Sequence, residues 1–173
     1  MSVQAVYDCM LFLAHAARPQ RVRETFDLVE NRKVTLFISL EILAEITDVL
    51  TRPEMRAKFP TLTAQAVSAF LDYVLQQASF IENVPEIYTV ARDPKDSKYI
   101  NLALAAGASH LVTRDKDLLI LMDQSSAEGR DFRQKFPQLQ IVEPRAFVQE
   151  LNQSAKANSG CASSSTPVTR CFC

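Results

Sequence analysis

The chain has 173 residues, of which 47% are hydrophobic and 23% charged, and its formal net charge is −1. This length suggests one domain, and the composition is that of a globular protein able to bury a core. A net charge so close to zero excludes a nucleic-acid binder that relies on the field of the whole molecule, so such binding must come from a local basic patch. With three glycines in all, the chain has no glycine-rich phosphate loop.

Strand and helix patterns alternate along the chain. Short β-branched or aromatic runs predict strands, and apolar residues recurring every three or four positions predict helices. The expected elements are, in chain order, a strand at 3–8, helix 21–32, strand 34–39, helix 40–50, helix 63–77, strand 79–82, helix 93–107, strand 110–113, a short helix from Asp117, a polar segment at 124–138, strand 139–142 and a helix from Pro144. The sequence therefore predicts an α/β fold with a central parallel sheet of four to five strands sandwiched by helices.

The helix at 93–107 has the clearest ends. Asp93 can cap its N-terminus, Pro94 suits the first helical position, and Gly107 suits the position just past the C-terminus.

The composition changes after Leu151. We expect one domain at 1–151 and a disordered, low-complexity tail at 152–173, because serine, alanine and asparagine dominate there. Three of the four cysteines lie in that tail, so they cannot form disulfide bonds that cross-link the core. We find no pattern of a signal peptide or a membrane span and expect a soluble, cytoplasmic protein that does not bind membranes.

Acidic residues recur where the predicted strands end. Asp8 closes the first strand, and Glu45 lies in the second turn of helix 40–50, which follows the second strand. Asp96 belongs to the start of helix 93–107, and Asp115 follows strand 110–113. Sites in open parallel sheets form beyond the carboxyl ends of the strands. Each of these four segments is expected to place an acid at that edge of the sheet.

Divalent-metal catalysis is the chemistry that uses such a cluster. Mg²⁺ and Mn²⁺ prefer carboxylate oxygens and water, and a bound ion relieves the repulsion between the acids. The absence of a histidine or cysteine in the cluster favours these ions over zinc. We interpret His15 and His110 as structural residues.

Each acid also has a purely structural interpretation. Asp93 and Asp117 are most simply helix N-caps, and Asp96 complements a helix dipole with or without metal. Glu45 fits a solvated helix face. Asp8 has the weakest structural explanation, because it closes an apolar strand.

Beyond these patterns, the chain resembles a known family. The residues that carry the resemblance are Asp8, the stretch "SLEILAEITDVL" (39–50) and above all "RDPKDSKYINLALAAGASHLVTRDKDLL" (92–119). Over about residues 3–150 the chain looks like a PIN domain. It is especially similar to the bacterial PIN domains described as toxins of toxin–antitoxin systems, the VapC-like ribonucleases.

This resemblance implies a Mg²⁺- or Mn²⁺-dependent endoribonuclease that hydrolyses single-stranded RNA. The matching catalytic positions are Asp8, Glu45, Asp96 and Asp115, of which the three aspartates would bind metal. Thr113 would line the site, with Asp93 and Asp117 supporting it. The resemblance also implies a homodimer and an antitoxin as protein partner.

Basic residues near the acids could position phosphates. We assign this role to Arg114 and Lys95, and interpret Lys98 and Arg92 as solvated charges.

Two departures from the family pattern stand out. Asp8 is followed by Cys9-Met10 where the family usually has Thr-Asn, and Arg114 replaces the glycine usual between Thr113 and Asp115. The first departure motivates a rival hypothesis, a catalytically weak or inactive PIN-like module that binds RNA or protein. A receiver-like phosphoacceptor domain ranks lower, because no acidic pair follows the first strand and no lysine follows "LQIV".

Overall fold

The structure is a computed structural model that describes residues 2–159. Within this range the strands form one five-stranded sheet with the order β3-β2-β1-β4-β5, and all four pairings are parallel. The strands are β1 (Val3–Tyr7), β2 (Val34–Ser39), β3 (Ala78–Ile81), β4 (His110–Val112) and β5 (Gln140–Val142). The predicted α/β fold and its parallel sheet are confirmed.

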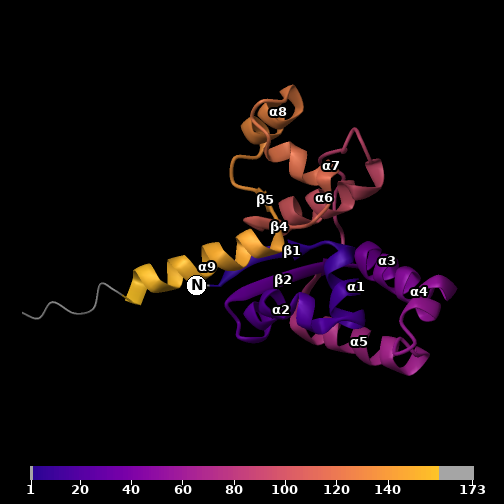
Figure 1. Cartoon of the computed structure of the whole chain (residues 1–173). Coiled ribbons are helices and arrows are strands. Elements are labelled where there is room, and N and C mark those ends of the chain that lie inside the picture. Colours follow the sequence, from indigo (N-terminus) through magenta and orange to yellow (C-terminus); the bar gives the residue numbers. More distant parts are fainter. Residues whose placement is uncertain (1, 160–173) are drawn as a thin grey trace, which may run out of the picture.

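Helices cover both faces of the sheet. They are α1 (Cys9–Ala17), α2 (Arg23–Glu30), α3 (Leu40–Thr51), α4 (Pro53–Lys58), α5 (Ala64–Gln77), α6 (Ser97–Ala105), α7 (Lys116–Leu119), α8 (Ala127–Lys135) and α9 (Pro144–Ser159), with 3₁₀ turns η1 (Pro19–Arg21), η2 (Pro94–Asp96) and η3 (Ile120–Met122). Helix α6 lies on one side of the sheet, whereas α1, α2 and α5 lie on the other (Figure 1).

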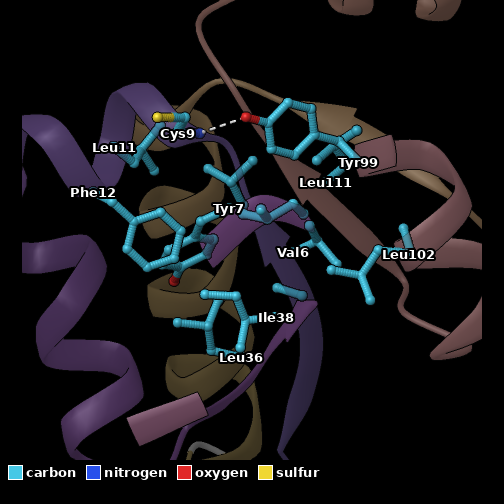
Figure 2. Packing of buried hydrophobic residues seen from close by; sticks show 14 of the residues in the cluster. Val6, Tyr7, Cys9, Leu11, Phe12, Leu36, Ile38, Tyr99, Leu102 and Leu111 are labelled. Atoms are coloured by element: carbon cyan, nitrogen blue, oxygen red, sulfur yellow. Dashed lines mark hydrogen bonds between the residues drawn. The ribbon is translucent and has the colours of Figure 1, made fainter. Parts of the chain in front are cut away.

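The central strand β1 shows how the two faces are filled. Successive strand residues point to opposite faces, and Figure 2 shows Tyr7 next to Phe12 of α1 while Val6 points towards Leu102 of α6. Tyr7 also makes an edge-to-face contact with Phe26 of α2, with ring centroids 5.5 Å apart. All these side chains are buried, so β1 ends inside a packed core and its last residues are held firmly.

The predicted helix at 93–107 is present with small differences. Asp93 caps it by accepting a hydrogen bond from the Lys95 backbone N–H at 3.0 Å, and Pro94 is the first residue of the 3₁₀ turn η2. Helix α6 follows from Ser97, and Gly107 after its end has a φ of 63°, the left-handed conformation that glycine adopts without strain.

Three helices were not predicted, namely α1, α4 and α8. The sequence of α1, "CMLFLAHAA", is apolar on nearly every position, so it lacks the amphipathic period on which helix prediction relies. Helix α8 was missed because its sequence is almost entirely polar. Its only large buried side chain is Phe132, so no repeating apolar pattern marks the helix.

The predicted domain end at Leu151 does not coincide with an end of secondary structure. Helix α9 continues to Ser159, eight residues further, so the predicted disorder does not begin at Asn152. The rest of the predicted tail lies outside the described residues. No helix in the described part of the chain is long and apolar enough to cross a membrane.

Candidate active site

Strands β1 and β4 are neighbours, so the residues that follow them meet at the carboxyl edge of the sheet. The backbone N–H of Asp8 still donates to the Val112 carbonyl, at 3.1 Å, which continues the ladder by one residue. Asp8 then starts α1, and Asp115 starts α7. The predicted convergence of these two acids therefore has a direct cause in the strand order.

Asp8 is a buried carboxylate, with 4% of its surface exposed, that accepts three hydrogen bonds. Its Oδ1 accepts from the Leu11 backbone N–H at 2.9 Å, which makes Asp8 the N-cap of α1. Its Oδ2 accepts from the Thr113 hydroxyl and from the Arg114 backbone N–H, the latter at 3.2 Å. Burial raises the pKa of Asp8, and these donors oppose the rise. An ionised carboxylate has about four acceptor positions, so one remains for a further ligand.

Thr113 ties the two strand-end acids together. It is fully buried, donates to Asp8 and accepts from the Asp115 backbone N–H at 2.9 Å. Asp115 is exposed, and its Oδ1 accepts from the Asp117 N–H at 2.8 Å. The N-cap of the short helix α7 is therefore Asp115. The prediction that Asp117 caps this helix is wrong.

Glu45 reaches the same edge from α3. Its Oε2 accepts from the Tyr99 hydroxyl, and its Oε1 forms an ion pair with Lys98 at 3.2 Å. Tyr99 in turn accepts a hydrogen bond from the Cys9 backbone N–H at 3.1 Å, drawn as the dashed line in Figure 2. A chain of contacts thus runs from α1 through α6 to Glu45. The Lys98 side chain is only 11% exposed, so the interpretation of Lys98 as a solvated charge is wrong.

Asp96 is the acid without a hydrogen-bonded partner. It precedes α6, but its side chain does not cap that helix, and no described residue donates a hydrogen bond to its carboxylate. Partial burial, together with the charges of Asp115, Asp93 and Glu45, raises the pKa of Asp96 to about 6, with Lys98 acting in the opposite direction. Asp96 is therefore costly to ionise in this surrounding.

The four predicted catalytic acids influence one another electrostatically. The charge of Asp115 raises the pKa of both Asp8 and Asp96, and that of Glu45 raises the pKa of Asp96. Their oxygens are the ligands that a hard divalent cation prefers. Among the described residues, however, no three acidic, histidine or cysteine side chains stand close enough together to hold an ion. The carboxylate oxygens are of the chemical type that binds Mg²⁺ or Mn²⁺, but the carboxylates lie further apart than the ligands of a bound ion.

Cys9 adds no ligand to this set. Its thiol is buried, and burial with the nearby charges of Glu45 and Asp8 raises the pKa of Cys9 to about 12. A thiol that stays protonated is a poor metal ligand and a poor nucleophile.

The remaining predicted site residues lie around this edge. Arg114 and Lys95 are exposed and form no ion pair within the described residues. Arg92 pairs with Asp117 at 3.7 Å and with Glu128 of α8 at 3.6 Å, so it is not a free solvated charge. Asp93 is half-buried and caps η2.

Lys98 and Tyr99 were missed as parts of the site. Both act on Glu45, which lies 53 and 54 residues earlier in the chain, so no local spacing links them to it. Neither residue alone differs from an ordinary position at the start of an amphipathic helix.

The sequence pattern of the PIN domain matches residues 4–117. This range includes all four acids, together with strand β4 and nearly all of strand β1. The chain belongs to the PIN-domain family. PIN domains are in general nucleases, hydrolases of phosphodiester bonds that typically use divalent metal ions. The match ends before α8, β5 and α9. No curated protein matches the chain.

The raised pKa of Asp96 predicts a pH-dependent cost in stability. The folded protein holds a proton on Asp96 up to about pH 6, whereas an unfolded aspartate loses it near 3.8, so stability is lost as the pH rises through this window. We expect Asp96→Asn to remove this loss. Relative to wild type, the variant should gain roughly 1 to 2 kcal/mol between pH 3.5 and pH 7.5, measured by urea unfolding in EDTA, because solvent screening of this half-exposed carboxyl reduces the full value of its pKa shift. An equal difference between the two proteins at both pH values would contradict the assignment.

Proposed function

We propose that this PIN domain is a Mg²⁺- or Mn²⁺-dependent endoribonuclease that hydrolyses single-stranded RNA. The observation that carries the proposal is Asp96, a half-buried carboxylate with no hydrogen-bond donor beside other acids. Such a group is costly in the protein alone and becomes favourable next to a cation. The membership of the family and the placing of Asp8, Glu45 and Asp115 at the same edge support the same conclusion.

Asp8, Asp96 and Asp115 would hold the ion, with Glu45 as a further ligand or as the residue that orients the attacking water. When bound, the ion supplies an acidified water and stabilises negative charge on a phosphate oxygen. Because the thiol of Cys9 stays protonated, this residue offers no competing nucleophile in the cluster.

The neighbouring residues position these acids. Thr113 fixes the orientation of Asp8 through its hydroxyl, and the Arg114 backbone N–H holds the same oxygen. Tyr99 and Lys98 hold the two oxygens of Glu45. These contacts fix the orientation of Asp8 and Glu45 before an ion binds, which reduces the reorganisation that a catalytic site needs.

We extend the proposal to the biological setting. The resemblance of segment 92–119 to VapC-like proteins supports a toxin of a type II toxin–antitoxin pair, acting in the cytoplasm as a homodimer and neutralised by an antitoxin. Leu40 is 66% exposed at the start of α3, and it offers apolar surface for such contacts. A small upstream reading frame that encodes a DNA-binding N-terminus would support the pair.

The test is cleavage of a labelled single-stranded RNA by the full chain. We expect cleavage in Mn²⁺, none in EDTA, and much slower cleavage of the same RNA in a duplex. Asp48→Asn is a matched control for later aspartate variants, because Asp48 is exposed and paired with Arg52 on the surface of α3. Activity that persists unchanged in EDTA would contradict the proposal.

One observation favours a second candidate, a PIN-like module that binds RNA or protein without cleaving it. Lys98 already neutralises Glu45, and no three of the described acids converge on one point. This candidate predicts RNA or partner binding that is indifferent to EDTA, together with no cleavage in Mn²⁺.

A further inference from the structure

Three neighbouring cavities run along the surface beside Asp115. Their volumes are about 500, 220 and 600 Å³, and each is lined by both Arg21 and Arg114. Because all three border these two side chains, the cavities are adjacent to one another. Together we call them the arginine track, which runs from Asp115 and Phe59 at one end to Arg145 at the other.

The first cavity combines an apolar floor with a cationic rim. Met10, Leu13 and Met55 contribute apolar surface. Phe59 lies beneath two cations, with Arg18 5.1 Å and Lys58 5.6 Å from the centre of its ring. A volume of about 500 Å³ lies within the usual range of small-ligand sites.

The arginines of the track are not neutralised by acidic side chains of the described residues. In the described part of the chain, none of the four arginines forms an ion pair; they are Arg18, Arg21, Arg114 and Arg145. Two carboxylates, Glu24 and Glu143, line the second and third cavities, away from the Phe59 end. The surplus of unpaired guanidinium groups is complementary to a polyanion, and guanidinium is the cation that best matches phosphate.

We propose that the arginine track binds the backbone of a single-stranded RNA, and that the cavity over Phe59 takes an unpaired base next to the scissile phosphate. The inference rests on the proposed nuclease function, because Asp115 lines the Phe59 cavity and so places the acids beside the bound nucleotide. Phe59 is partly exposed, and an aromatic side chain flanked by cations is a usual platform for single-stranded bases.

Arg114 links the track to the acids. Its backbone N–H donates to Asp8 at 3.2 Å, while its side chain lines all three cavities. The arginine that replaces the usual glycine at this position thus adds a phosphate contact directly beside Asp8 without disturbing the bond to its carboxylate.

The experiment measures binding of a fluorescent ten-nucleotide oligouridine to the full chain in EDTA, where no metal-dependent cleavage can occur. Arg21→Gln combined with Arg114→Gln should weaken binding roughly tenfold or more and reduce the slope of log affinity against log salt by about two. Phe59→Leu should weaken binding roughly fivefold to 100-fold through lost stacking. Arg56→Gln, on the surface of α4 but outside the three cavities, should bind like wild type.

The outcomes separate the possible occupants. The inference is overturned if the double arginine variant and Phe59→Leu both bind like wild type, or if wild type does not bind at low salt. A second result would also overturn the inference: Phe59→Leu changes the oligomeric state in light scattering but leaves RNA affinity the same. The cavity would then be a protein interface. Circular dichroism checks that Phe59→Leu folds, and the exposed arginine variants test the track independently of it.

Failure of the inference is distinguishable from failure of the nuclease proposal. Asp48→Asn, which lies outside the three cavities, should bind oligouridine in EDTA as wild type does. If RNA binds along the track but is never cut in Mn²⁺, the track stands and the nuclease proposal fails. If RNA is cut with unchanged KM in the arginine variants, the nuclease proposal stands and the track fails.

Discussion

Replacing Asp8 by asparagine should reduce the proposed Mn²⁺-dependent ribonuclease activity by roughly 100-fold or more in kcat. Asp8 carries a buried charge at the centre of the site, and asparagine removes that charge with almost no change in volume. The protein should still fold, because an asparagine side chain can also cap α1 by accepting the hydrogen bond from the Leu11 N–H. The measurement is the initial rate of cleavage at saturating Mn²⁺.

Asp48→Asn provides the matched control for this change. It removes one negative charge from the exposed surface of α3, where Asp48 pairs with Arg52, and should cleave at the wild-type rate. Equal activity of wild type and Asp8→Asn would remove Asp8 from the catalytic machinery.

Thr113→Val should reduce both stability and activity. Valine has nearly the same shape as threonine but cannot donate to Asp8 or accept from the Asp115 N–H. Asp8 then loses one of three donors in a buried position, and we expect a fall of roughly 2 to 4 kcal/mol in the free energy of unfolding. Because Thr113 orients Asp8 relative to Asp115, kcat should also fall, by about tenfold or more.

Thr113→Ser separates these effects from simple loss of packing. Serine keeps the hydroxyl and loses a methyl group, so activity should stay near wild type while stability falls slightly. If serine and valine reduced activity equally, the hydroxyl would have no positioning role, and the methyl group would account for the loss. Both variants are measured by urea unfolding and by cleavage rate.

The sequence was sufficient to place most of the sheet and the segments that carry the four acids. The alternation of apolar strands with helices predicted a parallel sheet, and the carboxyl ends of parallel strands share an edge. Asp8 and Asp115 follow neighbouring strands, and Asp96 opens the helix between β3 and β4. These positions follow from strand ends and helix starts, which local patterns mark well.

The helix that begins at Asp8 could not be predicted in the same way. The stretch after Asp8 is apolar at nearly every position. One side of α1 is buried in the core, and Met10 and Leu13 on another side line the Phe59 cavity, so the pattern has no polar face. This also explains why Asp8 had no evident structural role in the sequence. Its role as N-cap depends on recognising the helix that follows.

The long-range partners of the acids were equally beyond local reasoning. Lys98 and Tyr99 contact Glu45 only because α6 packs close to α3 in the folded chain. Likewise, Asp115 rather than Asp117 caps α7, a difference of two residues that depends on the exact direction in which the chain leaves β4. Contacts between distant segments and cap geometry are set by tertiary packing.

The ion pair of Lys98 with Glu45 bears on how metal would bind. In the protein alone this ammonium group is the cation nearest to Glu45, and it also lowers the pKa of Asp96. A divalent ion would take over part of that role and compete with Lys98 for the same carboxylates. Metal affinity should therefore be moderate, and the acids should draw together only when the ion is present.

The most direct test of the central claim is Mn²⁺ binding by isothermal titration calorimetry, with wild type, Asp8→Asn and Asp48→Asn side by side. If the acids at the carboxyl edge form a metal centre, wild type and Asp48→Asn bind Mn²⁺ with the same affinity, and Asp8→Asn binds it at least about tenfold more weakly. Absence of measurable binding to wild type at millimolar Mn²⁺, or equal binding by Asp8→Asn, would contradict the account.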